Sequence, residues 1–159
     1  MQLSNRVDEP KLSPPPDRLP PHEPRAGENE TAVQAGKAAR ILIVEDDYLI
    51  AMQAESALTD AGFDIIGVAA TAEEALEMAR THEPVLAIMD IRLAGRRDGV
   101  DAAGDLFREL GLRCLFATAH EDRLVRARAE PFAPLGWLTK PYSMASLVRA
   151  VREATPRRN

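Results

Sequence analysis

Cysteine and aromatic residues are scarce in this sequence of 159 residues, which has one cysteine, one tryptophan, two tyrosines and four phenylalanines. The single cysteine, Cys114, excludes an internal disulfide and a zinc site built from several cysteines. No apolar run approaches the roughly 18 to 20 residues that a membrane-spanning helix needs, and the first residues lack the apolar segment of a signal peptide. We therefore expect a soluble, cytoplasmic protein without a membrane partner.

Positive charge is also in short supply, because 20 lysines and arginines face 25 acidic residues and the formal net charge is −5. Proteins that bind nucleic acid generally carry a basic patch or a high isoelectric point. We therefore expect no nucleic-acid partner.

The composition changes sharply near residue 40. Seven of the twelve prolines precede that point, and large apolar residues are sparse there. Such a segment cannot bury enough apolar surface to offset the entropy lost on ordering. We predict a disordered, proline-rich N-terminal tail over residues 1–39, one folded domain over residues 40–155 and a short C-terminal tail over residues 156–159.

Short apolar runs alternate with amphipathic stretches in the second part of the sequence. Strands are expected over residues 41–44, 63–69, 85–89, 113–117 and 135–138, and helices over residues 48–61, 71–81, 100–110, 121–129 and 143–154. Continuous apolar strands, each followed by a helix, indicate a parallel sheet covered on both faces. Right-handed crossovers then favour an open, doubly wound α/β fold with five strands.

Two helices carry recognisable starting signals. Thr71 and Glu74 fit a capping box, and Ser143 is suited to cap the last helix. For the first helix, Leu49, Met52 and Leu58 are available for a buried face.

Polar residues stand where the predicted strands end. Glu45 and Asp46 follow the first strand, Asp90 the third, Thr118 the fourth and Lys140 the fifth. Each alone could be a cap or a turn residue, but ligands bind at the carboxyl edge of such sheets, where all five would meet. Clustered carboxylates without imidazole or thiolate favour Mg²⁺. A lysine and a threonine beside them suit phosphoryl transfer to a carboxylate.

Five segments carry a resemblance to a known family. They are Ile-Leu-Ile-Val-Glu-Asp-Asp at 41–47, Met-Asp-Ile-Arg-Leu at 89–93, Asp-Gly at 98–99, Phe-Ala-Thr-Ala at 116–119 and Leu-Thr-Lys-Pro-Tyr at 138–142. Over about residues 40–155 the sequence resembles the receiver domain of two-component response regulators. That resemblance implies a (βα)5 fold of the flavodoxin-like, CheY-like type.

The resemblance also assigns a phosphoacceptor and a metal site. By this likeness Asp90 accepts a phosphoryl group from a histidine kinase or a histidine phosphotransfer protein. Glu45, Asp46 and Asp90, with the backbone carbonyl of Arg92, would hold Mg²⁺. The chain would not be an enzyme of the usual kind, but would catalyse its own Mg²⁺-dependent phosphorylation on aspartate and its own dephosphorylation.

Further positions take their expected roles from the family. Thr118 would bind a phosphoryl oxygen, Lys140 would pair with the charged site, and the Lys140–Pro141 peptide bond would be cis. Thr118 and Trp137 would form the conformational switch, although tyrosine or phenylalanine is more usual at the position of Trp137. Arg92 and His120 occupy positions that influence how fast water removes the phosphoryl group, and we hypothesise that they set its lifetime here.

Few residues follow the predicted domain, so we expect a single-domain response regulator that signals by phosphorylation-dependent protein binding. Two alternatives are a phosphoryl shuttle or sink for a histidine kinase and a phosphorylation-independent interaction module. A phosphatase with an aspartyl nucleophile is less well supported, because Asp90-Ile91-Arg92 lacks a second acid.

The expected partner surface combines the fourth predicted helix, the fifth strand and the fifth helix. A downstream protein or a second copy of the chain would bind there. Five arginines fall on its two helices: Arg123, Arg126, Arg128, Arg149 and Arg152.

Overall fold

The computed structural model describes residues 36–119 and 122–157, so nearly all of the predicted tail of residues 1–39 lies outside the described residues. Within the described ranges, five strands alternate with five α-helices, and one short 3-10 helix, η1 (Glu130–Phe132), precedes the last strand. The strands are β1 (Arg40–Val44), β2 (Asp64–Ala69), β3 (Leu86–Asp90), β4 (Cys114–Thr118) and β5 (Gly136–Thr139). The helices are α2 (Tyr48–Asp60), α3 (Ala72–His82), α4 (Gly99–Leu110), α5 (Arg123–Ala129) and α6 (Met144–Ala154).

All five strands form one parallel sheet in the order β2-β1-β3-β4-β5. The chain runs from β1 to β2 on one side and then crosses back to place β3 on the other side of β1. The direction of winding therefore reverses between β1 and β3, where Val44 pairs with Met89. This confirms the predicted doubly wound fold, and it places the carboxyl ends of β1 and β3 side by side.

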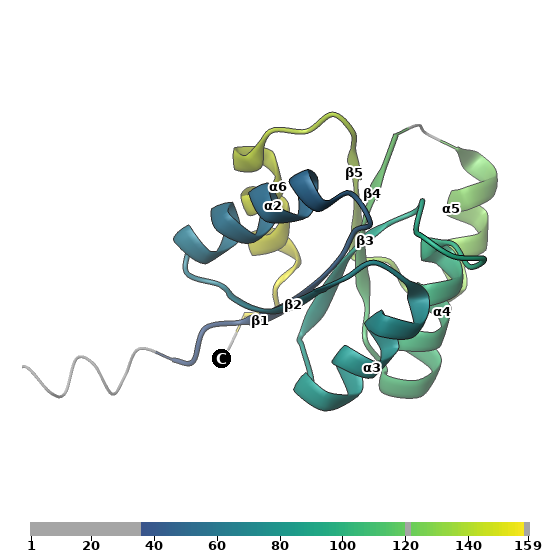
Figure 1. The fold of residues 1–159 in the computed structure, drawn as a ribbon, viewed down its shortest axis with the longest axis horizontal. Helices are drawn as coiled ribbons and strands as arrows, with labels where there is room; N and C mark the ends of the chain where they lie inside the picture. The colour runs from purple at the N-terminus through teal and green to yellow at the C-terminus, as the bar shows by residue number, and fades with distance from the viewer. Residues whose placement is uncertain (1–35, 120–121, 158–159) are drawn as a thin grey trace, which may run out of the picture. The chain divides into compact units, whose positions relative to one another are not determined.

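Helices cover both faces of the sheet, with α2 and α6 on one face and α3, α4 and α5 on the other (Figure 1). Alternate residues of β1 enter the two cores: Ile41 and Ile43 pack under α2 and α6, whereas Leu42 and Val44 pack under α3 and α4. This alternation follows from the period of two in a strand. It explains why the strands read as continuous apolar runs. In the described part of the chain, every helix is too short or too polar to cross a membrane.

The buried face of α2 differs from the prediction. Leu58 is buried as expected, but Leu49 and Met52 are 69% and 47% exposed, so that part of the prediction was wrong. The face toward the sheet consists of Ala51, Ala54 and Leu58, at the spacing of one helical face. The larger apolar side chains of the first turns therefore lie at the surface.

Cap residues set several element boundaries. Asp122 caps α5, which begins at Arg123 instead of residue 121. Ser143 caps α6 as predicted. Thr71 accepts a hydrogen bond from the Glu74 amide, but the Glu74 carboxylate accepts from the Ala70 amide, so the predicted capping box does not close on Thr71 itself.

The end of β3 touches the start of α4 directly. The Gly99 amide donates a hydrogen bond to the Ile91 carbonyl at 2.8 Å. A Cβ atom on Gly99 would lie 1.9 Å from the carbonyl oxygen of Asp90, which is far inside van der Waals contact. Only glycine therefore fits here without moving the backbone that carries Asp90.

We predict that Gly99→Ala lowers the free energy of unfolding by roughly 1–3 kcal/mol or more, because overpacking against backbone cannot be relieved by a rotamer change. Gly104→Ala in the same helix is the matched control. Its Cβ would meet the end of the Phe132 ring at 2.9 Å, which a side chain can relieve, and alanine adds about 1 kcal/mol of helix propensity. Urea unfolding measures the free energy of unfolding of both variants. Equal losses of this free energy in Gly99→Ala and Gly104→Ala would contradict the prediction.

Candidate functional site

Three carboxylates meet at the carboxyl edge of the sheet. Glu45 and Asp46 follow β1, and Asp90 is the last residue of β3. Glu45, Asp46 and Asp90 each offer a carboxylate oxygen within 4.8 Å of the others. Glu45 and Asp90 are buried, whereas Asp46 is exposed. Such an all-oxygen set with one open side fits a hard divalent cation that keeps several waters.

A lysine joins two of these carboxylates. Lys140 follows β5, and its amide donates to the Thr118 carbonyl at 2.7 Å, which ties the ends of β5 and β4 together. Its Nζ atom lies 2.9 Å from Oε2 of Glu45 and 3.2 Å from Oδ2 of Asp90. The Lys140–Pro141 peptide bond is cis.

Burial and pairing act in opposite directions on this cluster. Burial raises the pKa of Glu45 to about 7, against the lowering effect of the hydrogen bond from Lys140. Burial also disfavours the charged form of Lys140, but the hydrogen bond to Glu45 and the charge of Asp90 outweigh it and raise the pKa of the ammonium. Lys140 therefore stays charged, and a further cation nearby would favour the ionised form of Glu45.

Backbone amides orient the two buried carboxylates. The Arg92 amide donates to Oδ1 of Asp90 at 3.2 Å, and the Asp47 amide donates to Oε1 of Glu45 at 3.1 Å. Asp47 in turn caps α2 by accepting from the amides of Leu49 and Ile50. Each buried carboxylate thus has one oxygen bound by a backbone amide and the other beside Lys140.

A cavity of about 170 Å³ opens in front of Asp90. It is lined by Asp90, Ile91, Arg92, Thr118, Ala119, Asp122, Val125 and Lys140. The structure thus brings the predicted acceptor, threonine and lysine to one cavity, with Arg92 at its lining. Asp122 and Val125 were not predicted. Asp122 could have been recognised from the sequence as a candidate helix cap, because this aspartate lies four residues after Thr118, the last residue of β4.

Trp137 lies on β5. Its ring stacks on Phe116 with centroids 4.7 Å apart and planes inclined by 16°, and the Arg126 guanidinium lies 4.9 Å from the indole centre. The predicted switch aromatic is therefore half-buried between an aromatic ring and a cation. His120, the other residue predicted to tune the site, lies outside the described residues.

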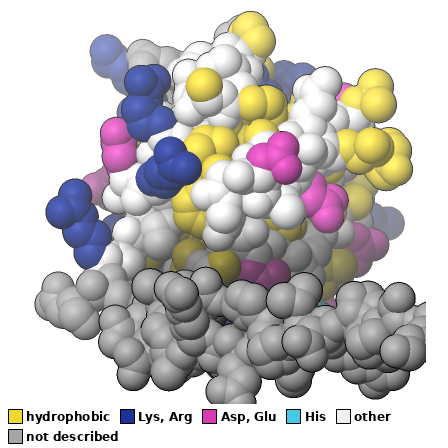
Figure 2. Space-filling view, turned by 90° about the vertical axis from the view of Figure 1, so that its left-hand side faces the viewer, with side chains coloured by type: hydrophobic (Ala, Val, Ile, Leu, Met, Phe, Trp, Pro, Cys, Tyr) yellow, Lys and Arg dark blue, Asp and Glu magenta, His cyan; other side chains and the backbone are white. Residues whose placement is uncertain are grey.

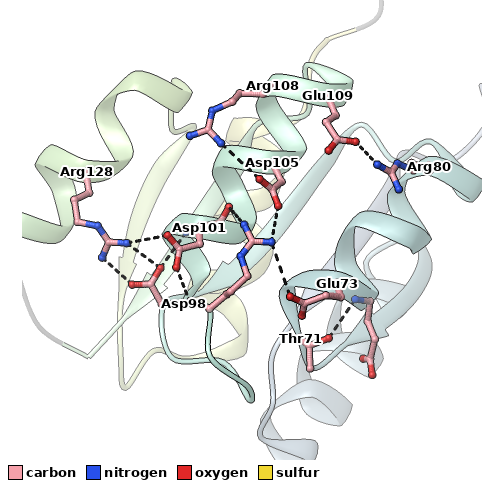
Figure 3. A network of polar contacts seen from close by, with 11 residues as sticks. Thr71, Glu73, Arg80, Asp98, Asp101, Asp105, Arg108, Glu109 and Arg128 are labelled. Carbon is pink, nitrogen blue, oxygen red and sulfur yellow. Dashed lines mark hydrogen bonds and ion pairs between the residues drawn. The ribbon is translucent and has the colours of Figure 1, made fainter.

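An ion-pair network fixes α5 to the start of α4 (Figure 3). The Arg128 guanidinium donates to both carboxylate oxygens of Asp98 at 2.7 and 3.1 Å, and it reaches Asp101 at 3.3 Å. Burial disfavours the charge on Asp98, but the hydrogen bonds from Arg128 and from the backbone amides of Asp101 and Val100, together with the charge of Arg128, outweigh this effect and lower the pKa of Asp98. Of the five arginines on the predicted partner surface, Arg126 and Arg128 are thus engaged within the molecule.

Comparison with known proteins identifies related chains. The model of the response regulator receiver domain family matches residues 41–152. The transcriptional regulatory protein PdtaR of Mycobacterium tuberculosis is 35% identical over 127 residues, which cover 80% of this chain and 62% of PdtaR. The phyllosphere-induced regulator PhyR of Methylorubrum extorquens is 35% identical over 76% of this chain and 45% of its own length. The chain thus spans less than two thirds of either relative.

Solved structures of similar fold include receiver domains as well. The signal receiver domain of a modulated diguanylate cyclase from Desulfovibrio desulfuricans is 35% identical, with a TM-score of 0.68 over 74% of this chain and 93% of its own. The signal receiver domain of the response regulator NarL from Mycobacterium tuberculosis is 27% identical, with a TM-score of 0.67 over 76% of this chain and 99% of its own.

We predict that the metal-free protein becomes less stable as the pH rises from about 4.5 through about 7, the raised pKa of Glu45 in the folded state. The folded state binds the proton of Glu45 more tightly than the unfolded state does, so this contribution is complete below pH 4.5 and is lost above pH 7. Urea unfolding in the presence of a chelator measures it.

Glu45→Gln should remove this part of the pH dependence, and Glu55→Gln, at an exposed position of α2, should keep it. Parallel stability curves for the wild type and Glu45→Gln would contradict the assignment.

Proposed function

The chain belongs to the response regulator receiver domain family, and we propose that it accepts a phosphoryl group on Asp90 from a phosphohistidine. The donor would be a histidine kinase or a histidine phosphotransfer protein. One observation carries the proposal: the Asp90 carboxylate lines a cavity at the carboxyl edge, with a lysine ammonium 3.2 Å from one of its oxygens.

The transfer is a substitution at phosphorus. An Asp90 oxygen forms the new P–O bond, the P–N bond of the phosphohistidine breaks, and the imidazole nitrogen keeps the electron pair. Lys140 offsets charge on the phosphoryl oxygens as a fixed positive charge that needs no reorganisation. Thr118, buried at the cavity wall, supplies a hydroxyl hydrogen bond to one of these oxygens.

We assign Mg²⁺ as the cofactor on the basis of the donor set. Glu45, Asp46 and Asp90 would hold the ion, with the backbone carbonyl of Arg92 as a further ligand. When bound, Mg²⁺ compensates the negative charge of the carboxylates and of the phosphoryl oxygens. The pairing of Lys140 with both Glu45 and Asp90 supports this assignment, because one ammonium cannot neutralise three carboxylates.

The donor is expected to approach over α2. Tyr48, Leu49 and Met52 are exposed on the first turns of this helix, which begins three residues after Glu45. Figure 2 shows hydrophobic side chains at the surface on this side of the molecule. An apolar surface next to the acceptor would allow a donor helix to bury its own apolar side chains while its phosphohistidine reaches Asp90.

The phosphorylated protein would signal through its binding to another protein. The face formed by α5, β5 and α6 is the proposed surface for a downstream protein or a second copy of the chain. The alternative, a phosphoryl shuttle or sink, differs in the lifetime of the phosphoryl group, because a sink returns or loses it quickly and a switch keeps it.

We predict that the protein gains one phosphoryl group when incubated with acetyl phosphate and Mg²⁺, as measured by intact mass. Asp90→Asn should gain none, because it lacks the nucleophilic oxygen. Asp64→Asn, an exposed acidic position at the start of β2, is the control and should react as the wild type does. Uptake of a phosphoryl group by Asp90→Asn would show that another residue is the acceptor.

We predict that Arg92→Ala shortens the lifetime of the phosphoryl group severalfold. Arg92 is an exposed residue at the cavity lining, where its side chain restricts the approach of water to phosphorus. The decay of the phosphorylated mass over time measures the rate, with His120→Ala tested alongside. Unchanged rates of phosphoryl loss in both variants would show that neither Arg92 nor His120 determines the lifetime.

A further inference from the structure

Glu74, in the first turn of α3, contacts the backbone that follows β2. Its Oε2 atom accepts a hydrogen bond from the Ala70 amide at 2.9 Å, while its own amide donates to Oγ1 of Thr71 at 3.2 Å. A hydrogen bond to an ionised carboxylate is roughly twice as strong as one between neutral groups. The carboxylate of Glu74 therefore fixes the orientation of the peptide group between Ala69 and Ala70.

This peptide group also holds the end of β1. Its carbonyl, which belongs to Ala69, accepts a hydrogen bond from the Glu45 amide at 2.9 Å, and its N–H is the group that Glu74 binds. Hydrogen bonds that follow one another in this way polarise and strengthen each other. Glu74 is thus linked through a single peptide group to the backbone of Glu45, a proposed ligand of Mg²⁺.

The next carbonyl along the chain holds the loop that follows Asp90. The Ala70 carbonyl accepts a hydrogen bond from the Ala94 amide at 3.2 Å. Since β1 lies between β2 and β3 in the sheet, this hydrogen bond joins segments from both sides of the carboxyl end of β1. The loop that carries Arg92, whose carbonyl is a further proposed ligand, is therefore bound to the same short segment as Glu45.

Glu74 lies beside the carboxylate cluster without belonging to it. It lines one cavity of about 310 Å³ together with Glu45 and Asp46. It is not one of the three residues, Glu45, Asp46 and Asp90, whose carboxylate oxygens lie within 4.8 Å of one another. Groups that orient metal ligands without touching the metal change its affinity by about 10- to 100-fold when they are mutated.

From these contacts we propose that Glu74 is a positioning residue for the Mg²⁺ site. Its carboxylate holds the peptide group between Ala69 and Ala70, and this segment keeps the backbone of Glu45 and the loop of Arg92 in the arrangement in which they share one ion. Glu74 itself does not contact the ion. This inference rests on the proposed function, because it requires the metal site assigned there.

Urea unfolding of the full chain, in chelator and with increasing Mg²⁺ at constant pH and ionic strength, tests this role. An ion that binds only the folded state raises the free energy of unfolding by an amount set by its concentration and its dissociation constant. The measurement in chelator therefore reports the stability of each variant, and the increase with Mg²⁺ reports the affinity. Glu74→Ala should raise the dissociation constant about tenfold. Glu74→Gln, which keeps an accepting oxygen, should raise it less.

Two control variants in the same turn separate positioning from capping and from charge. Thr71→Ala removes the other side-chain hydrogen bond at the start of α3, so it should lower the stability in chelator but leave the Mg²⁺ dissociation constant unchanged. Glu73→Gln removes a charge at the adjacent exposed position, whose carboxylate lies 3.9 Å from Arg97. It should also leave the dissociation constant unchanged.

Hydrogen exchange of the metal-free protein measures the positioning itself. The amides of Glu45 and Ala94, which are bound by the segment after β2, should exchange severalfold faster in Glu74→Ala than in the wild type. The Ser146 amide, bound by the Ser143 cap of α6, is the internal control and should not change.

Unchanged Mg²⁺ affinity in Glu74→Ala would overturn the proposal, and so would unchanged exchange of both amides. A loss of affinity in Thr71→Ala or Glu73→Gln as large as in Glu74→Ala would also overturn it, because helix stability or general charge would then be the cause. Absence of any stabilisation of the wild type by Mg²⁺ would overturn the metal assignment and this inference with it. Absence of phosphoryl uptake would overturn the role of Asp90 as acceptor, and the mass measurement detects that failure separately.

Discussion

The position of one ammonium group between two buried carboxylates is the constraint on which the site depends. Lys140 contacts Glu45 and Asp90 at the ends of β1 and β3, and its own strand, β5, is separated from β3 by β4. Two carboxylates removed from water repel each other, and an unpaired buried charge costs several kcal/mol. The pair is tolerated because the lysine reaches across the edge of the sheet and because burial leaves Glu45 partly protonated near neutral pH. The single ammonium group leaves the carboxylate cluster with excess negative charge. This excess gives the cluster affinity for a second cation.

The fold supplies the geometry that this constraint requires. Reversal of the winding direction between β1 and β3 brings Glu45 and Asp90 side by side, although α2, β2 and α3 separate them in the sequence. Gly99 then allows α4 to begin in contact with the backbone of Asp90. Asp90 is thus held by its strand, by a helix start and by the Arg92 amide. In the proposed role of nucleophile, a carboxylate held this firmly would react without a large loss of conformational entropy.

Sequence reasoning predicted the sheet well, because strands buried on both faces appear as continuous apolar runs. It also predicted that Glu45, Asp90 and Lys140 would come to one edge, since parallel strands place their carboxyl ends together. It failed for the face of α2, where small side chains of alanine allow close packing and Leu49 and Met52 remain outside. Apolar character alone does not distinguish a buried leucine from one kept at a surface.

Contacts between helices were beyond the same reasoning, because they depend on how distant turns pack. The pairing of Arg128 with Asp98 joins residues 30 positions apart, and no local sequence pattern connects the two positions. Asp122 could be recognised as a cap, but its place at the cavity depends on the path of the chain after β4. Two helices near Asp90 thus differ in their contacts: α2 presents apolar side chains outward, whereas α5 is bound to α4 and to Trp137. Since α2 and α5 cover opposite faces of the sheet, a donor bound on α2 would leave α5 accessible, whereas α6, the other helix of the proposed response surface, lies on the same face as α2.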